Sequence, residues 1–280
     1  YAMQTASRGM SRQAHLEYVR SGLPALNALK DFLSHASQDD GQWDQLATSL
    51  MDLHQRLISL PKHALIICEA EQTERLSDLI VNSWKDSRAS ELAVEKTEIN
   101  TEDGIPSEFA DLKLDPTLDG DCVADKVVES GAAIDVTDLA WLVATNVYHN
   151  ASVYSAPAAD HPDTAALMVL APYLRNGYLH SAIRERGGAY GGGAGYDANA
   201  CAFKFFSYRD PHCVETFEHF DASIEWLLNE PQTAEQLEEA ILGIISGMDK
   251  PGSPAGEAVK ACFADLHHRG ADWQRKMRAT

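Results

Sequence analysis

Residues 184–196 read Arg-Glu-Arg-Gly-Gly-Ala-Tyr-Gly-Gly-Gly-Ala-Gly-Tyr, with six glycines among the nine positions from 187 to 195. They follow directly on an apolar pattern of helical period. Glycine allows sharp turns, positive φ angles and close approach to another chain. Arg184 and Tyr190, six residues apart, therefore lie in a segment that looks like a hinge built to reach a bound ligand.

A glycine cluster is also typical of a plain flexible linker. Linkers are usually flanked by Ser and other polar residues, whereas this segment joins an amphipathic helical pattern to a strand pattern. Bulky Tyr190 and Tyr196 interrupt the glycines, which a spacer does not need. One structural alternative stays open. In it, Arg184 caps the end of its helix, where cations are favoured, and Tyr190 packs on the sheet.

The segment 183–192 resembles the R-x-K/R-G-G-A-Y-G motif of the pitrilysin/insulinase superfamily of zinc metallopeptidases, and most of all its presequence-protease branch. Gly177-Tyr178-Leu179 and the run 207–211 (Ser-Tyr-Arg-Asp-Pro) fit that branch too. Agreement is weaker at His161-Pro162-Asp163 and over 247–251. The resemblance is specific over 146–254 and diffuse outside it.

This resemblance implies the C-terminal half of a zinc-dependent endopeptidase that degrades unfolded peptides in a closed chamber. It assigns catalytic roles to Arg184, which positions the peptide backbone, and to Tyr190, which stabilises the oxyanion. It assigns substrate binding to Gly187, Gly188 and Gly191. The implied partners are a peptide substrate and the N-terminal half of the same polypeptide. Zinc is implied for the full-length enzyme, with its ligands outside this chain.

The residue chemistry agrees with these roles. Amide hydrolysis places negative charge on the former carbonyl oxygen, and a preplaced donor lowers that barrier. A tyrosine hydroxyl is such a donor. Arginine adds a permanent charge and a forked set of donors for a carbonyl or carboxylate.

No zinc motif of either order, H-x-x-E-H or H-E-x-x-H, occurs in the chain. The nearest approach is Glu215-Thr216-Phe217-Glu218-His219, which has Glu215 in place of the first histidine and is interpreted as the polar face of a helix. His267 and His268 are adjacent, so they project to different sides of a helix. The sequence therefore predicts no metal ligands and, by itself, no activity for the chain.

Composition narrows the remaining classes. The 280 residues carry a net charge of −19, which argues against a nucleic-acid surface. The apolar runs are too short to span a bilayer, so no membrane partner is expected. The five cysteines form no C-x-x-C pair, which favours thiols in a reducing compartment and led to a prediction of a cytoplasmic protein.

Periodicity predicts an α+β fold, a mostly antiparallel sheet with helices packed on one face, repeated as two domains of which the first is incomplete. Residues 1–90 are expected to be the C-terminal part of a third peptidase-like domain, 91–120 a linker, and 121–280 a fourth domain truncated at its C-terminus. Helices are expected at 11–34 with a break at Gly22, 42–60, 73–85, 162–183, 214–228, from Thr233, and 254–268; strands are expected at 64–68, 139–148 and 200–208.

Two rival functions remain. One is a non-catalytic partner subunit of the same superfamily; such members tend to lose the Arg/Tyr pair, which this chain keeps. The other is an unrelated peptide-binding module whose glycine segment is a plain hinge.

Overall fold

The computed structural model describes residues 1–37, 41–59, 64–89, 138–266, 269 and 273–279. These belong to two compact units. The first takes its described residues from Tyr1–Lys30, Leu114–Lys250 and Gln274–Thr280, and the second from Asp31–Lys113 and Pro251–Trp273. The predicted linker 91–120, and His267 and His268, lie outside the described residues.

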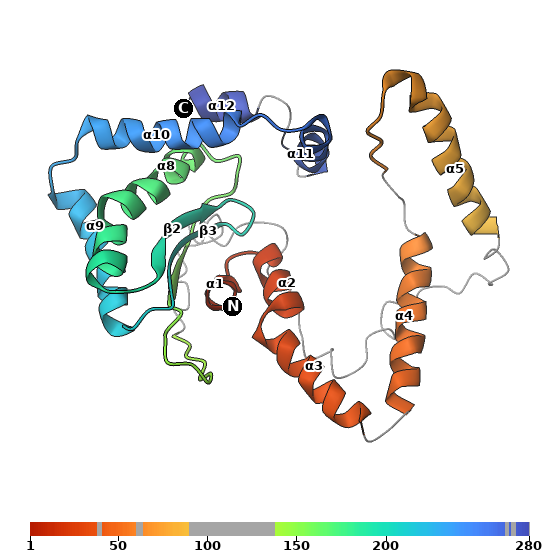
Figure 1. Ribbon diagram of the computed structural model, residues 1–280, viewed down its shortest axis with the longest axis horizontal. Helices are drawn as coiled ribbons and strands as arrows, with labels where there is room; N and C mark the ends of the chain where they lie inside the picture. Colours follow the sequence, from red (N-terminus) through yellow and green to blue (C-terminus); the bar gives the residue numbers. More distant parts are fainter. Residues whose placement is uncertain (38–40, 60–63, 90–137, 267–268, 270–272, 280) are drawn as a thin grey trace, which may run out of the picture. The chain divides into compact units, whose positions relative to one another are not determined.

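The first unit holds the sheet and the helices packed on it (Figure 1). Its elements are α1 (Ala2–Ser7), α2 (Arg12–Ser21), β1 (Ala151–Ser155), α8 (Thr164–Leu174), the π-helix η2 (Arg175–Arg186), β2 (Gly191–Asp197), β3 (Ala202–Tyr208), α9 (Val214–Asn229) and α10 (Ala234–Asp249). The second unit holds helices α4 (Gly41–Ser59), η1 (Ala70–Gln72), α5 (Thr73–Ala89) and α11 (Pro254–Leu266). Helices α3 (Leu23–Ala36) and α12 (Trp273–Ala279) cross the boundaries between the two.

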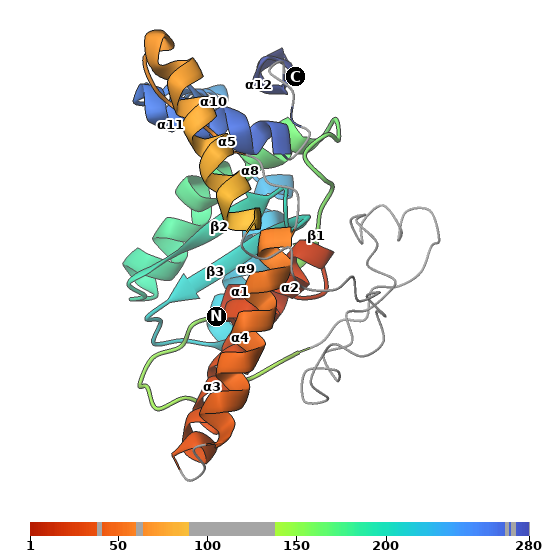
Figure 2. The ribbon, with the colours of Figure 1, turned by 90° about the vertical axis from the view of Figure 1, so that its right-hand side faces the viewer.

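The three strands form an antiparallel sheet in the order β1-β3-β2. In its register Ala151 pairs with Phe206 of β3, and Gly191 pairs with Tyr208 at the other edge of the same strand. The central strand is therefore β3, the most apolar of the three. Figure 2 shows β2 and β3 side by side with α1 beside the sheet.

One face of the sheet carries the main core. Because side chains alternate between faces along a strand, Phe203 and Phe205 point the same way. They pack in one buried cluster with Leu174, at the end of α8, and Ile183, on η2, while Phe220 of α9 closes it. Helix α10 packs in turn on α8 (Figure 1). The helices of this face thus form the cover that the sequence predicted.

The opposite face is covered in part by the N-terminal segment. Ala202 of β3 and Val153 of β1 pack with Met10 and with Ala14 of α2. The predicted fold class, α+β with a mostly antiparallel sheet, is confirmed. The repetition as two domains, and the division at 90 and 120, remain predictions.

Helix ends follow the local chemistry. Ser11 accepts a hydrogen bond from the backbone N–H of Ala14, and Thr233 accepts one from that of Gln236, so both act as N-caps. The predicted break at Gly22 is confirmed, because α2 ends at Ser21 and α3 begins at Leu23.

Pro172 lies inside α8, where its missing N–H removes one i→i−4 hydrogen bond. The chain continues without a break, but from Arg175 it winds as a π-helix to Arg186. Proline usually kinks a helix, and here the structure has a change of helix type directly after it. Single π-turns are the usual form, so a π-helix of 12 residues is long.

Two predicted strands are wrong. Residues 64–68 have no regular structure, with Leu65 and Ile67 exposed. Of the predicted strand 139–148, only Tyr148 forms a bridge, with Asp210, and the true strand β1 begins at Ala151. The apolar run 139–144 lacks the strict alternation of a half-buried strand, whereas β1 pairs through a Ser- and Ala-rich sequence that propensity alone does not mark.

Candidate functional site

The glycine segment forms a turn followed by a strand. Residues 187–190 make the turn, and Gly191 opens β2. Gly188 has φ +77°, a conformation that glycine adopts without the steric cost of a Cβ. The backbone N–H of Gly188 donates to the carbonyl of Arg184 at 3.1 Å, and that of Ala189 donates to the carbonyl of Ile183 at 3.1 Å. In this conformation the segment between Arg184 and Tyr190 is thus a hydrogen-bonded turn, and the reach that it was expected to give the two side chains remains a prediction.

The glycines of β2 serve close packing instead. A Cβ on Gly191 would lie 2.5 Å from the hydroxyl of Tyr208, so the absence of a side chain lets that ring lie over the strand. A Cβ on Gly192 would lie 2.9 Å from the carbonyl oxygen of Phe206 and 3.1 Å from Cγ2 of Ile183. Gly191 and Gly192 are therefore needed for space rather than for flexibility.

Tyr190 stands out from this packing because it is 61% exposed. Its ring lies 5.7 Å from that of Tyr208, and the guanidinium carbon of Arg209 lies 5.5 Å from its centroid. Its backbone N–H donates to the carbonyl of Arg209 at 3.2 Å. Among the described residues, its hydroxyl has no hydrogen-bond partner. The structure thus holds the ring and leaves the hydroxyl open.

Arg184 lies in the last turn of η2, four positions before Gly188. Its side chain is exposed and makes no ion pair within the part of the chain that the structure describes. In a chain with 42 acidic and 23 basic residues, an arginine left unpaired is available to bind a ligand. Its place at a helix C-terminus also fits the capping alternative.

A β-bulge follows the end of β3. Asn150 and Ser207 exchange two backbone hydrogen bonds, of 2.9 and 3.2 Å, and Tyr148 and Asp210 exchange two more, of 2.7 and 3.0 Å. Two residues of one strand, 208 and 209, therefore lie opposite the single residue 149 of the other. Arg209 has φ +49° there, in the left-handed region. Bulges of this kind redirect side chains.

The buried side chain of Asp210 fixes the backbone directly after the bulge. It is 1% exposed and accepts hydrogen bonds from the hydroxyl of Thr216 at 2.8 Å and the backbone N–H of His212 at 2.9 Å. The side-chain amide of Asn150 donates to it at 3.4 Å. Arg209 and Asp210 are adjacent in sequence but form no ion pair with each other. The carboxylate is turned inward and the guanidinium lies over Tyr190.

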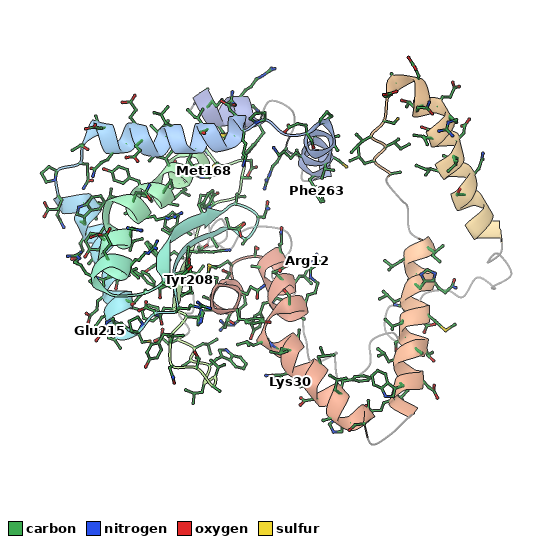
Figure 3. All side chains as sticks on the ribbon, in the orientation of Figure 1. Arg12, Lys30, Met168, Tyr208, Glu215 and Phe263 are labelled. Atoms are coloured by element: carbon green, nitrogen blue, oxygen red, sulfur yellow. The ribbon has the colours of Figure 1, made fainter. Side chains whose placement is uncertain are left out.

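Tyr208 ends β3, and Arg209 follows it in the bulge. Their contacts with Tyr190 were not predicted. The register of β2 on β3, which sets Gly191 opposite Tyr208, was the missing information. Figure 3 labels Tyr208 at the end of β3 and Glu215 at the start of α9.

Metal-binding groups do not gather in the part of the chain that the structure describes. No set of three His, Cys, Asp or Glu side chains lies close enough there to hold an ion. Glu215 lies 4.0 Å from Nδ1 of His212, and the ring of His219 lies 6.4 Å from that of Tyr178. The described residues therefore do not fit the zinc that the family resemblance implies.

The cysteines are not all thiols. Cys201, which has φ +51°, is disulfide-bonded, whereas Cys68, Cys213 and Cys262 are free. The expectation of thiols only is wrong for Cys201.

Among the described helices, none is long and apolar enough to cross a membrane.

Residues 146–277 match the family model described as the PreP C-terminal domain. This match begins where the resemblance becomes specific, and it includes Arg184, Tyr190 and the bulge. The resemblance of this segment to the presequence-protease branch of the pitrilysin/insulinase superfamily is therefore confirmed.

Individual relatives agree. The mitochondrial presequence protease of Kluyveromyces lactis is 43% identical over 114 residues, 40% of this chain and 12% of that protein. That of Eremothecium gossypii is 41% identical over 133 residues, 47% of this chain and 13% of that protein. That of Aspergillus fumigatus is 27% identical over 274 residues, 96% of this chain and 22% of that protein. The chain thus spans less than a quarter of these relatives' length.

The predicted cytoplasmic location is contradicted, because these relatives are named mitochondrial. Cysteine spacing indicates the redox state of a compartment, but it does not identify the compartment. The prediction inferred a compartment from a redox state.

Proposed function

We propose that this chain is the part of a zinc-dependent endopeptidase that supplies an Arg/Tyr pair to a metal site elsewhere in the protein. The relatives named presequence protease support a peptidase. Zinc, when bound at that metal site, would polarise the scissile carbonyl and activate water.

Within this proposal, Tyr190 donates a hydrogen bond to the oxygen on which negative charge develops. The observation that carries the role is its geometry: the ring is held by Tyr208 and Arg209 while the hydroxyl is exposed and has no partner among the described residues. A donor that is already oriented needs no reorganisation when the charge appears.

Arg184 binds the peptide itself. Its exposed guanidinium can donate two parallel hydrogen bonds to backbone carbonyls or to a terminal carboxylate of the substrate. Gly187 and Gly188 shape the turn between Arg184 and Tyr190, and Gly191 leaves room for Tyr208. Their proposed contribution to substrate binding is therefore to place the pair.

The test is steady-state kinetics of the full-length enzyme on an unfolded peptide. Tyr190→Phe should lower kcat by about a hundredfold, the usual loss for one oxyanion donor, with little change in KM. Arg184→Ala should raise KM as well, because the charge also holds the ground state. Zinc content and melting temperature should match the unchanged enzyme.

The matched controls are Tyr154→Phe, an exposed tyrosine on β1, and Arg186→Ala, in the same helical turn as Arg184. Both should keep near-normal kinetics. If Tyr190→Phe kept kcat within about twofold, the tyrosine would be a packing residue and the proposal would fail.

A further inference from the structure

Arg209 occupies a backbone conformation that costs free energy. It and Cys201 are the non-glycine residues with positive φ among those the structure describes. Arginine has no short polar side chain to stabilise the left-handed region locally, as Asn and Asp do. Such conformations persist where the surroundings hold them, and they concentrate at functional sites.

The surroundings of Arg209 do hold it. On one side the backbone pairs Ser207 with Asn150, and on the other it pairs Asp210 with Tyr148. The buried carboxylate of Asp210 is bonded to Thr216 and to the N–H of His212, so the strand cannot relax at that end. The extra residue is thereby forced out of the ladder, and its side chain is redirected.

We propose that Arg209 is a positioning residue for Tyr190, an inference that rests on the proposed function of that tyrosine. The bulge turns the guanidinium onto the Tyr190 ring, and the cation holds the ring in the orientation that presents its hydroxyl.

Three contacts support this role. The guanidinium carbon lies 5.5 Å from the ring centroid, within the range of a cation–π interaction. The carbonyl of Arg209 accepts the backbone N–H of Tyr190, so the same residue fixes both the main chain and the ring. Tyr208 packs on the ring at 5.7 Å, in space that Gly191 leaves open. Tyr208 and Arg209 thus both contact the phenol ring, while its hydroxyl has no hydrogen-bond partner among the described residues.

The lack of a carboxylate partner for Arg209 among the described residues agrees with this role. Asp210, the next residue, directs its oxygens toward Asn150, Thr216 and His212. No ion pair of Arg209 occurs within the described part of the chain, and its guanidinium contacts the Tyr190 ring. A guanidinium committed to a carboxylate would be a weaker partner for an aromatic face.

The strained backbone allows a sharp experiment. Arg209→Gly removes the guanidinium and at the same time relieves the positive φ, which glycine accepts freely. In the full-length enzyme we expect a melting temperature equal to or above that of the unchanged protein. We expect kcat for an unfolded peptide to fall about fivefold, the rate equivalent of one exposed cation–π contact, with KM within about twofold.

Two further variants separate positioning from folding. Arg209→Lys keeps a cation over the ring and should recover part of kcat. Arg209→Asn tolerates the left-handed region but carries no charge, so it should behave like Arg209→Gly. If kcat and melting temperature fell together in both the Gly and Asn variants, Arg209 would serve the fold alone, and the proposal would be overturned.

A double-mutant cycle ties the effect to the hydroxyl. In a Tyr190→Phe background, Arg209→Gly should change kcat by less than twofold, because the group that it positions is gone. Full additivity would overturn the inference. If Tyr190→Phe by itself left kcat unchanged, the proposed function would fail first. If Tyr190→Phe lowered kcat and Arg209→Gly did not, only the present inference would fail.

Discussion

Gly192 and Gly195 lie in the same strand but face different surroundings. A Cβ on Gly192 would press on the carbonyl oxygen of Phe206 and on Ile183, whereas one on Gly195 would meet nothing within 4 Å. Moving the backbone of Phe206 or the buried side chain of Ile183 aside would cost free energy. We therefore expect Gly192→Ala to lower the free energy of unfolding by about 1–3 kcal/mol, as overpacking does.

Gly195→Ala is the matched control. Alanine there should leave stability unchanged or raise it by about 0.5 kcal/mol, because it restricts the unfolded chain. Urea unfolding of both variants followed by far-UV circular dichroism measures the difference. Equal effects at the two positions would show that the glycines of β2 serve flexibility, and would contradict the close-packing account.

The family resemblance singled out Arg184 and Tyr190 from the sequence, since a motif is a local pattern. It did not reach Arg209 or Asn150, because their roles depend on pairing between residues 57 or more positions apart. Adjacency in sequence also does not pair Arg209 with Asp210, because the bulge directs the guanidinium to the Tyr190 ring while the carboxylate of Asp210 accepts from Thr216 and His212.

The hairpin of β2 and β3 contains a carboxyl, that of Asp197, whose pKa is lowered. Burial by itself raises the pKa of Asp197, but the hydrogen bond and charge of Lys204 and the backbone N–H groups of Ala200 and Asn199 outweigh it. Together they hold the pKa below its ordinary value of 3.8. The carboxylate of Asp197 bonds Nζ of Lys204 at 2.7 Å. It also accepts the N–H groups that close the turn between the strands.

The sign of the pH effect follows. A carboxyl with a folded-state pKa below its unfolded value contributes stability that is complete above the unfolded pKa and is lost as pH falls through the folded one. Asp197→Asn should therefore destabilise the protein at pH 7, and the difference from the unchanged chain should shrink as pH falls below about 4. Melting temperatures of both proteins from pH 7 to 3 measure this. A difference independent of pH would contradict the ionic account of the turn.

Helices were easier to predict than strands at the scale of elements. The stripe of Leu residues in 42–60 repeats at helical period, and α4 spans Gly41–Ser59 as expected. Strands depend on partners. β2 is a glycine-rich run that no propensity marks as a strand, and it forms because Gly191 and Gly192 let it pack closely on β3 and η2. Residues 64–68 have high β-propensity and no partner strand among the described residues.

The organisation of the whole molecule was predicted only in part. The two compact units interleave along the chain, so the first unit combines α1 and α2 with a sheet that begins at Ala151. Contacts such as that of Ala14 with Ala202 join residues far apart in sequence, and composition gives no sign of them. The boundaries at 90 and 120 rest on lost periodicity and remain predictions.

Under the proposed function, this chain supplies its Arg/Tyr pair to a zinc site that lies outside it. The isolated 280-residue chain should bind no stoichiometric zinc and cleave no peptide, because its sequence has neither zinc motif and its described residues gather no metal cluster. Metal analysis after a mild chelator wash, with a peptidase assay on the same sample, measures both. Adding the separately expressed remainder of the protein should restore cleavage, and a chain with Tyr190→Phe should restore far less. Zinc that survives the wash, or cleavage by the isolated chain, would place the metal site in this chain. Either result would contradict the proposal that the Arg/Tyr pair serves a metal site elsewhere in the protein.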